Sequence, residues 1–65
     1  MPSYRAAPSF QCHAPSKVFP EAADALKYAG EAARRMHVGY EVWKRHNGRL
    51  TLVQRFPAVP RPDTR

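Results

Sequence analysis

Residues 40–56 read YEVWKRHNGRLTLVQRF, two runs rich in β-branched and aromatic side chains on either side of an Asn-Gly step. Asn47 and Gly48 both tolerate a positive φ, which a two-residue hairpin turn requires. The sequence therefore predicts a β-hairpin over residues 40–56. A two-residue turn also fixes its register, with three predicted pairs: Arg45–Leu50, Trp43–Leu52 and Val42–Val53.

This pairing sorts the hairpin side chains onto two faces. One face carries a Tyr–Val group with two cations: Tyr40, Val42, Lys44, Thr51, Val53 and Arg55. The other carries an aromatic and aliphatic group with polar neighbours: Glu41, Trp43, Arg45, Leu50, Leu52, Gln54 and Phe56. A single helix covers only one face, and the sequence does not say which. Since exposed apolar faces usually mark interfaces, we expect Leu50, Leu52 and Phe56 to form a dimer or partner interface. The alternative is that the N-terminal segment covers the second face with Tyr4 and Phe10.

Residues 20–36 precede the hairpin and show helical periodicity. Apolar side chains recur there at steps of 4, 3, 4 and 3, at Ala22, Leu26, Ala29, Ala33 and Met36. Pro20 suits the first position of a helix, where its missing N–H is not needed. Because the apolar stripe is mostly alanine, the helix should lie close to whatever it covers, and Gly30 inside it suggests close backbone approach.

The two ends of the chain have a different composition from this core of residues 20–56. Residues 1–19 are punctuated by Pro and Ser, and we expect a short strand at residues 9–14, between Pro8 and Pro15. Residues 57–65 contain three prolines and should form an extended, mobile tail. The predicted order is β-α-β-β. The expected fold class is α+β, with one helix packed on a small antiparallel sheet that ends in the Asn-Gly hairpin.

The charge of the chain points to anionic partners. Its 65 residues include 11 Lys and Arg against 5 Asp and Glu, for a net charge of +6. Cations gather on the hairpin, so the candidate binding residues are Lys44, Arg45, Arg49 and Arg55, with Trp43 or Tyr40 as an aromatic anchor. The expected partner is an acidic protein surface or a nucleoprotein complex. One alternative is an accessory nucleic-acid-binding domain that sets the same hairpin on DNA or RNA, and another is a structural subunit of a larger assembly.

The sequence offers no chemistry for catalysis. The soft metal ligands, Cys12, His13, His37 and His46, lack the paired spacing of a zinc site. The three glycines do not form a phosphate-binding loop. We therefore expect no enzymatic activity, no cofactor and no bound metal.

Chain length and cysteine content bear on the oligomeric state and the cellular compartment of the protein. A chain this short buries only about 60% of its unfolded surface, so we expect it to gain stability as a homodimer. Its single cysteine favours a reducing compartment such as the cytoplasm. No apolar run is long enough to span a membrane. The first 20 residues lack acids, as in a mitochondrial import sequence, but prolines 2, 8, 15 and 20 would break the helix that import needs.

Residues 20–56 resemble small phage-encoded proteins of the anti-CRISPR type. The resemblance lies in the order of a helix containing Ala29, a strand, the Asn47-Gly48 turn and the strand at Leu50-Thr51-Leu52. It implies a non-enzymatic inhibitor that docks on a nucleoprotein effector and blocks its nucleic-acid site. That role would fall on the exposed hairpin residues. The same order is also similar to small bacterial domains that imply no mechanism.

Overall fold

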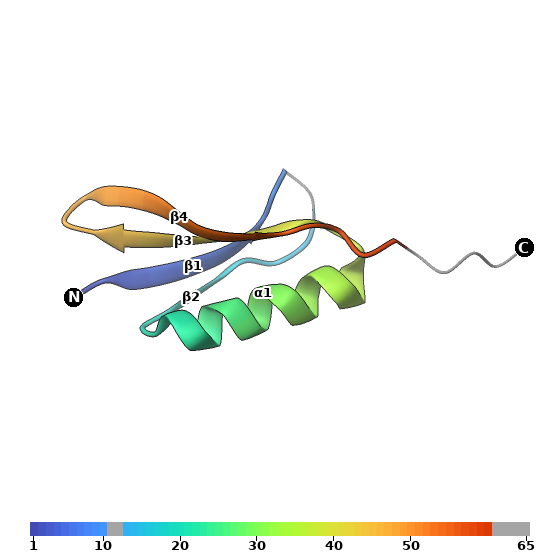
Figure 1. Cartoon of the computed structure of the whole chain (residues 1–65), viewed down its shortest axis with the longest axis horizontal. Helices are drawn as coiled ribbons and strands as arrows, with labels where there is room; N and C mark the ends of the chain where they lie inside the picture. The colour runs from blue at the N-terminus through green and yellow to red at the C-terminus, as the bar shows by residue number, and fades with distance from the viewer. Residues whose placement is uncertain (11–12, 61–65) are drawn as a thin grey trace, which may run out of the picture.

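The computed structural model describes residues 1–10 and 13–60. Its elements, in chain order, are β1 (Ser3–Pro8), β2 (Lys17–Phe19), α1 (Ala22–Met36), β3 (Tyr40–His46) and β4 (Arg49–Phe56). The strands form one antiparallel sheet in the order β2-β1-β3-β4. The helix lies along one side of this sheet (Figure 1). The predicted α+β class, with one helix on a small antiparallel sheet and a C-terminal hairpin, is confirmed.

The β-α-β-β order is confirmed by β1, α1, β3 and β4, but the predicted N-terminal strand is misplaced. It lies at Ser3–Pro8 rather than at residues 9–14, and the short strand β2 follows it before the helix. Residues 9, 10, 13 and 14 belong to the connection, and residues 11–12 lie outside the described residues. Strand β1 pairs with β3 over Ser3–Pro8 and with β2 over Tyr4–Ala6, and it ends at Pro8, which has no backbone N–H to donate.

The helix α1 begins at Ala22 and ends at Met36. Its N-cap residue is Glu21, in extended conformation, so Pro20 precedes the helix instead of occupying its first position. At the other end His37 adopts a left-handed conformation, with φ 58°, and its N–H donates to the Ala33 carbonyl at 3.0 Å. This closes the last turn and directs the chain into β3. No helix among the described residues has the length and apolar character needed to cross a membrane.

Small side chains fill the space between the helix and the sheet. The fully or almost fully buried hydrophobic residues are Ala6, Ala25, Ala29, Ala32, Ala33, Tyr40 and Val42. The predicted burial of Ala29 and Ala33 is confirmed, whereas Leu26 is only half-buried and the unpredicted Ala25 and Ala32 are buried. Alanines let the helix approach the sheet closely, so the longer Leu26 lies at the margin of the contact.

Tyr40 is the largest fully buried side chain, and it ties three parts of the fold together. Its hydroxyl donates to the Pro15 carbonyl at 2.6 Å, in the connection between β1 and β2. Its ring meets that of Tyr28 on α1 edge-on, with centroids 6.3 Å apart. The rings of Tyr40 and Tyr28 therefore fill the part of the core that the small alanine side chains leave open.

The hairpin turn forms as predicted, with φ of 52° at Asn47 and 75° at Gly48. The pairs Arg45–Leu50 and Trp43–Leu52 are confirmed, but the Val42–Val53 pair is wrong. A β-bulge shifts the register there, so that Val42 lies opposite Gln54. One extra residue exchanges the faces of all later residues on β4.

The bulge moves Gln54 and Phe56 to the helix side of the sheet and Arg55 to the opposite side. Phe56 is half-buried there, and its ring lies 3.5 Å from where a Cβ on Gly30 would be. The alternative cover from the N-terminal segment is also wrong, because Tyr4 packs against the core while Phe10 is exposed. The second face of the sheet is left uncovered by the described residues.

Candidate binding surface

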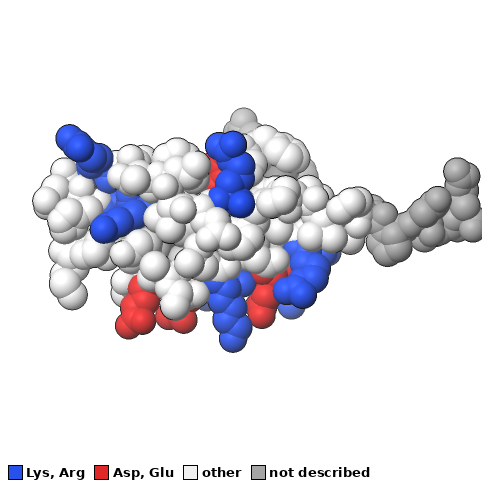
Figure 2. Space-filling model, viewed as in Figure 1, with Lys and Arg blue, Asp and Glu red and all other residues white. Residues whose placement is uncertain are grey.

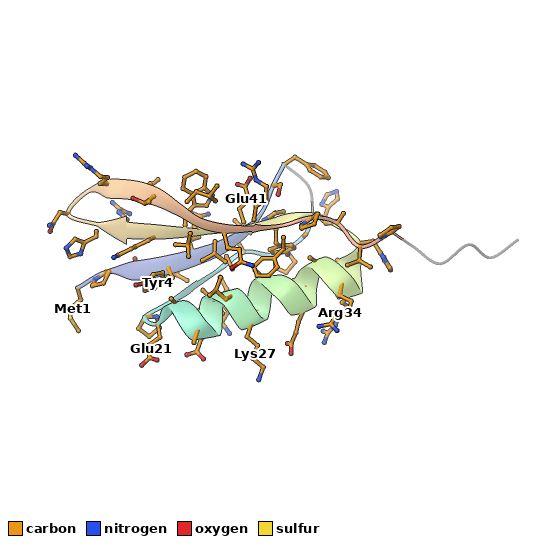
Figure 3. The ribbon with its side chains drawn as sticks, in the orientation of Figure 1. Met1, Tyr4, Glu21, Lys27, Arg34 and Glu41 are labelled. Carbon is orange, nitrogen blue, oxygen red and sulfur yellow. The ribbon has the colours of Figure 1, made fainter. Side chains whose placement is uncertain are left out.

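We call the side of the sheet opposite α1 the open face. Strand register places on it residues from all four strands: Ser3, Arg5, Ala7, Val18, Glu41, Trp43, Arg45, Leu50, Leu52 and Arg55. Figure 3 shows Glu41 on the side of the sheet away from the helix, while Lys27 and Arg34 project from the helix away from the sheet. The open face and the exposed side of the helix are thus the two broad surfaces of the molecule.

A groove of about 660 Å³ hollows the open face. It is lined by residues of β1, β2 and the hairpin, namely Ser3, Arg5, Ala7, Val18, Trp43, Arg45, Gly48 and Leu50. In register, Arg5 lies between Val18 of β2 and Trp43 of β3. Val18 is 57% exposed and Leu50 62% exposed, so apolar walls reach solvent on both sides of a central guanidinium. Such a surface combines apolar contact area with a fixed positive charge.

Glu41 fixes the aromatic residue of this surface. One oxygen of its carboxylate, Oε1, accepts a hydrogen bond from Trp43 Nε1 at 3.1 Å. The other, Oε2, accepts one from Arg55 Nε at 3.0 Å. The Glu41 side chain is only 15% exposed. Since both oxygens are engaged, Glu41 orients the Trp43 indole and neutralises Arg55, and it leaves the other cations of the face unbalanced.

Arg5 and Arg45 are those unbalanced cations. Across residues 1–10 and 13–60, the ion pair that forms is Arg55–Glu41. Figure 2 shows the acidic side chains mainly along the helix, where basic ones lie among them, and further basic side chains at the hairpin end of the molecule. An incoming group that brings carboxylate or phosphate oxygens would find two guanidinium groups with no acidic partner among the described residues.

The structure brings together only part of the predicted binding set. Trp43, Arg45, Leu50, Leu52 and Arg55 do share the open face. The remaining predicted residues, Tyr40, Lys44, Arg49 and Phe56, lie outside it.

Tyr40 is not available as an anchor, because it is fully buried beneath α1. Lys44 lies on the helix side of the sheet, one position along the strand from Trp43, since successive residues alternate faces. Phe56 lies on that side because of the bulge. Arg49 is exposed beside the turn, outside the groove.

The groove residues from β1 and β2, among them Arg5 and Val18, lie outside the predicted set. Ser3, Arg5 and Ala7 alternate with Tyr4 and Ala6, a pattern of period two that signals a strand. The proline-bounded segment at 9–14 competed with that signal. Once β1 is placed at Ser3–Pro8, Arg5 necessarily lies on the face opposite the buried Ala6.

Among the described residues no three His, Cys, Asp or Glu side chains gather in a group able to hold a metal ion. Comparison of the chain with protein families, with curated proteins and with solved structures gives no match. The functional interpretation therefore rests on the geometry of the open face, and the resemblance to proteins of the anti-CRISPR type stays a prediction.

Proposed function

We propose that this chain is a small, non-enzymatic binding protein that docks through its open face on an acidic protein surface, alone or within a nucleoprotein complex. The observation that carries the proposal is Arg5, a guanidinium at the centre of an exposed apolar face with no acidic partner among the described residues. A partner that supplies a carboxylate to Arg5 and apolar side chains to Trp43 would satisfy both kinds of group at once.

The composition of the face favours a protein partner over nucleic acid. Beside its arginines the face exposes aliphatic side chains, at Val18, Leu50 and Leu52, and Trp43, its aromatic ring among the described residues, is half-buried. Trp and Arg are enriched among residues that dominate protein interfaces. Single-stranded nucleic acid is instead held by several aromatic rings along a basic groove, which successive bases stack upon.

Nucleic-acid binding is the second candidate, supported by the exposed cations at the hairpin end. Arg45, His46 and Arg49 surround the turn without an acidic neighbour on the hairpin tip. These side chains could lie along phosphates. Binding would then fall steeply with salt, because each neutralised phosphate releases a counterion.

Selection from a random displayed peptide library tests the first candidate. The bound pool should be enriched in peptides that combine Asp or Glu with large apolar residues. The Trp43→Ala variant should lose most of that enrichment, whereas Thr51→Ala on the helix side of the same hairpin should keep it. Equal enrichment by Trp43→Ala and the unmodified protein would exclude the open face as the docking surface.

Anisotropy of labelled duplex and single-stranded DNA and RNA, titrated at two salt concentrations, tests the second. Docking on protein predicts weak binding with little sequence dependence. The second candidate would replace the first if binding is micromolar or tighter and is lost at higher salt. The Arg45→Ala, Arg49→Ala double variant should then show a shallower dependence of affinity on salt concentration.

Inhibition of a nucleoprotein effector of phage defence is one use of such a face, and a subunit of a larger assembly is another. The first rests on the order of the elements alone. A chain that is unstable in isolation and recovers only with its partner would favour the second.

A further inference from the structure

The strand β4 forms one edge of the sheet, and it is long and exposed. It runs over eight residues, Arg49–Phe56, and all but Phe56 are exposed. The opposite edge, β2, has only three residues, Lys17–Phe19. Edge strands usually carry charges, prolines or bulges that prevent pairing with another chain. On β4 the arginines and the bulge lie outside Leu50–Leu52, and that segment has neither charge nor proline.

The hairpin geometry determines which backbone groups of β4 reach the edge. His46 and Arg49 flank a two-residue turn and therefore exchange both hydrogen bonds, after which bonded and non-bonded pairs alternate. Thr51 thus bonds inward to Lys44. The N–H and C=O groups of Leu50 and Leu52 point outward, to the free edge.

We propose that β4 pairs antiparallel with β4 of a second copy, about a two-fold axis at Thr51. In this register Leu50 of each copy lies opposite Leu52 of the other, so the outward groups of both leucines form hydrogen bonds across the axis. Thr51 lies opposite itself as a non-hydrogen-bonded pair. The two sheets then continue as one, and the bulge after Leu52 ends the paired segment.

The charges of β4 permit this pairing. Arg49 of one copy lies opposite Val53 of the other and not opposite another arginine. The two Arg49 residues are separated by four positions along the strands, roughly 14 Å. That separation exceeds the Debye length of about 10 Å at 0.1 M salt, so their repulsion is largely screened.

Charge also selects the edge over the open face as the site of self-association. Packing two open faces together would bury Arg5 and Arg45 of both copies, and Glu41 is already engaged by Trp43 and Arg55. Buried guanidinium groups without a partner are strongly unfavourable. Edge pairing leaves these cations in solvent, and it suits a domain whose core is mostly alanine, because small domains gain stability by association.

Edge pairing does not depend on the proposed docking function. It would place Leu50 and Leu52 of both copies at the centre of one continuous open face, with a groove on each side. A monomeric protein would still present its own groove, so failure of one proposal leaves the other standing.

Sedimentation equilibrium over a range of concentrations tests the dimer, with two variants of equal charge. Thr51→Lys sets two lysines opposite each other at the axis and should raise the dimer dissociation constant at least tenfold. Gln54→Lys adds the same charge to the same strand, beyond the paired segment. It should leave the dimer dissociation constant within about threefold of that of the unmodified protein. Circular dichroism establishes that both variants fold.

Cross-linking tests the register. Two Thr51→Cys chains in a Cys12→Ser background would hold their Cα atoms about 4.5 Å apart, within the range that a disulfide spans. Oxidation should link them rapidly, and Gln54→Cys chains slowly. Amide exchange at Leu50 and Leu52 should slow as the protein concentration rises.

Three results would overturn the proposal: a monomer at every concentration, a dimer that Thr51→Lys leaves intact, or protection of Leu50 and Leu52 that appears only when a foreign peptide is added.

Discussion

The two faces of the sheet are built from the same strands and have opposite chemistry. The helix side carries the buried residues Ala6, Tyr40 and Val42, closed by alanines from α1. The open face carries Arg5 and Trp43, which neighbour Ala6 and Val42 in the sequence, together with Leu50 of β4. Side chains alternate along a strand, so one set can be selected for packing while the other is free for binding. Substitutions on the helix side should therefore change stability, and those on the open face should change binding.

The largest effect is expected at Tyr40, the largest fully buried side chain. Tyr40→Ala should lower the free energy of unfolding by about 3–5 kcal/mol, because it leaves a cavity among residues too short to fill it. Tyr40→Phe removes only the hydroxyl, with its hydrogen bonds to the Pro15 carbonyl and to Met36 Sδ, and should cost about 1 kcal/mol. Urea unfolding followed by circular dichroism measures both. A Tyr40→Ala cost no greater than that of Tyr40→Phe would contradict the placement of this ring in the core.

A smaller effect is expected from enlarging the alanines of α1. Ala29→Leu inserts three carbons into the close contact between helix and sheet and should cost about 1–3 kcal/mol. Ala23→Leu on the exposed side of the same helix is the matched control, since leucine and alanine differ little in helix propensity. Thermal unfolding of the two variants should separate them clearly; similar melting temperatures would mean that the helix is not seated on its alanines.

The smallest effect is expected at Gly30, and it has the opposite sign. A Cβ there would lie 3.5 Å from the Phe56 ring, an ordinary contact distance. Gly30→Ala should therefore stabilise the protein by about 0.5–1 kcal/mol, the gain in helix propensity. The sequence interpretation of Gly30 as a site of close backbone approach would instead predict a loss, so the sign of the change in urea unfolding decides between them.

The elements with strong local signals could be predicted from sequence. Asn47-Gly48 set the turn, and the periodicity of residues 20–36 gave the helix to within two residues of its start. The features that were missed depend on pairing between distant segments. The bulge between Val42 and Trp43 has no local signature, yet it decides which face Phe56 and Arg55 occupy.

The part of the candidate site that lies on the hairpin could be predicted, because local sequence determines it. Trp43, Arg45, Leu50 and Leu52 share a face because the turn fixes their register, and this needed only local sequence. Arg5 required knowledge that β1 is a central strand beside β3, a contact between segments almost forty residues apart. The residue that carries the functional proposal thus depends on a long-range strand pairing, which local sequence patterns do not specify.

The most direct test of the open face as the docking surface compares two equal changes of charge. Arg5→Glu reverses the charge at the centre of the open face, and Arg49→Glu reverses one beside the turn, outside the groove. The measurement is the affinity of each variant for an acidic, apolar peptide selected on the unmodified protein. Docking through the open face predicts at least a tenfold loss for Arg5→Glu, the equivalent of about 1.4 kcal/mol, with Arg49→Glu within about threefold of the unmodified protein at moderate salt, where distant charges are screened. Equal losses in the two variants would show that the peptide responds only to net charge, and would contradict the open face as its binding site.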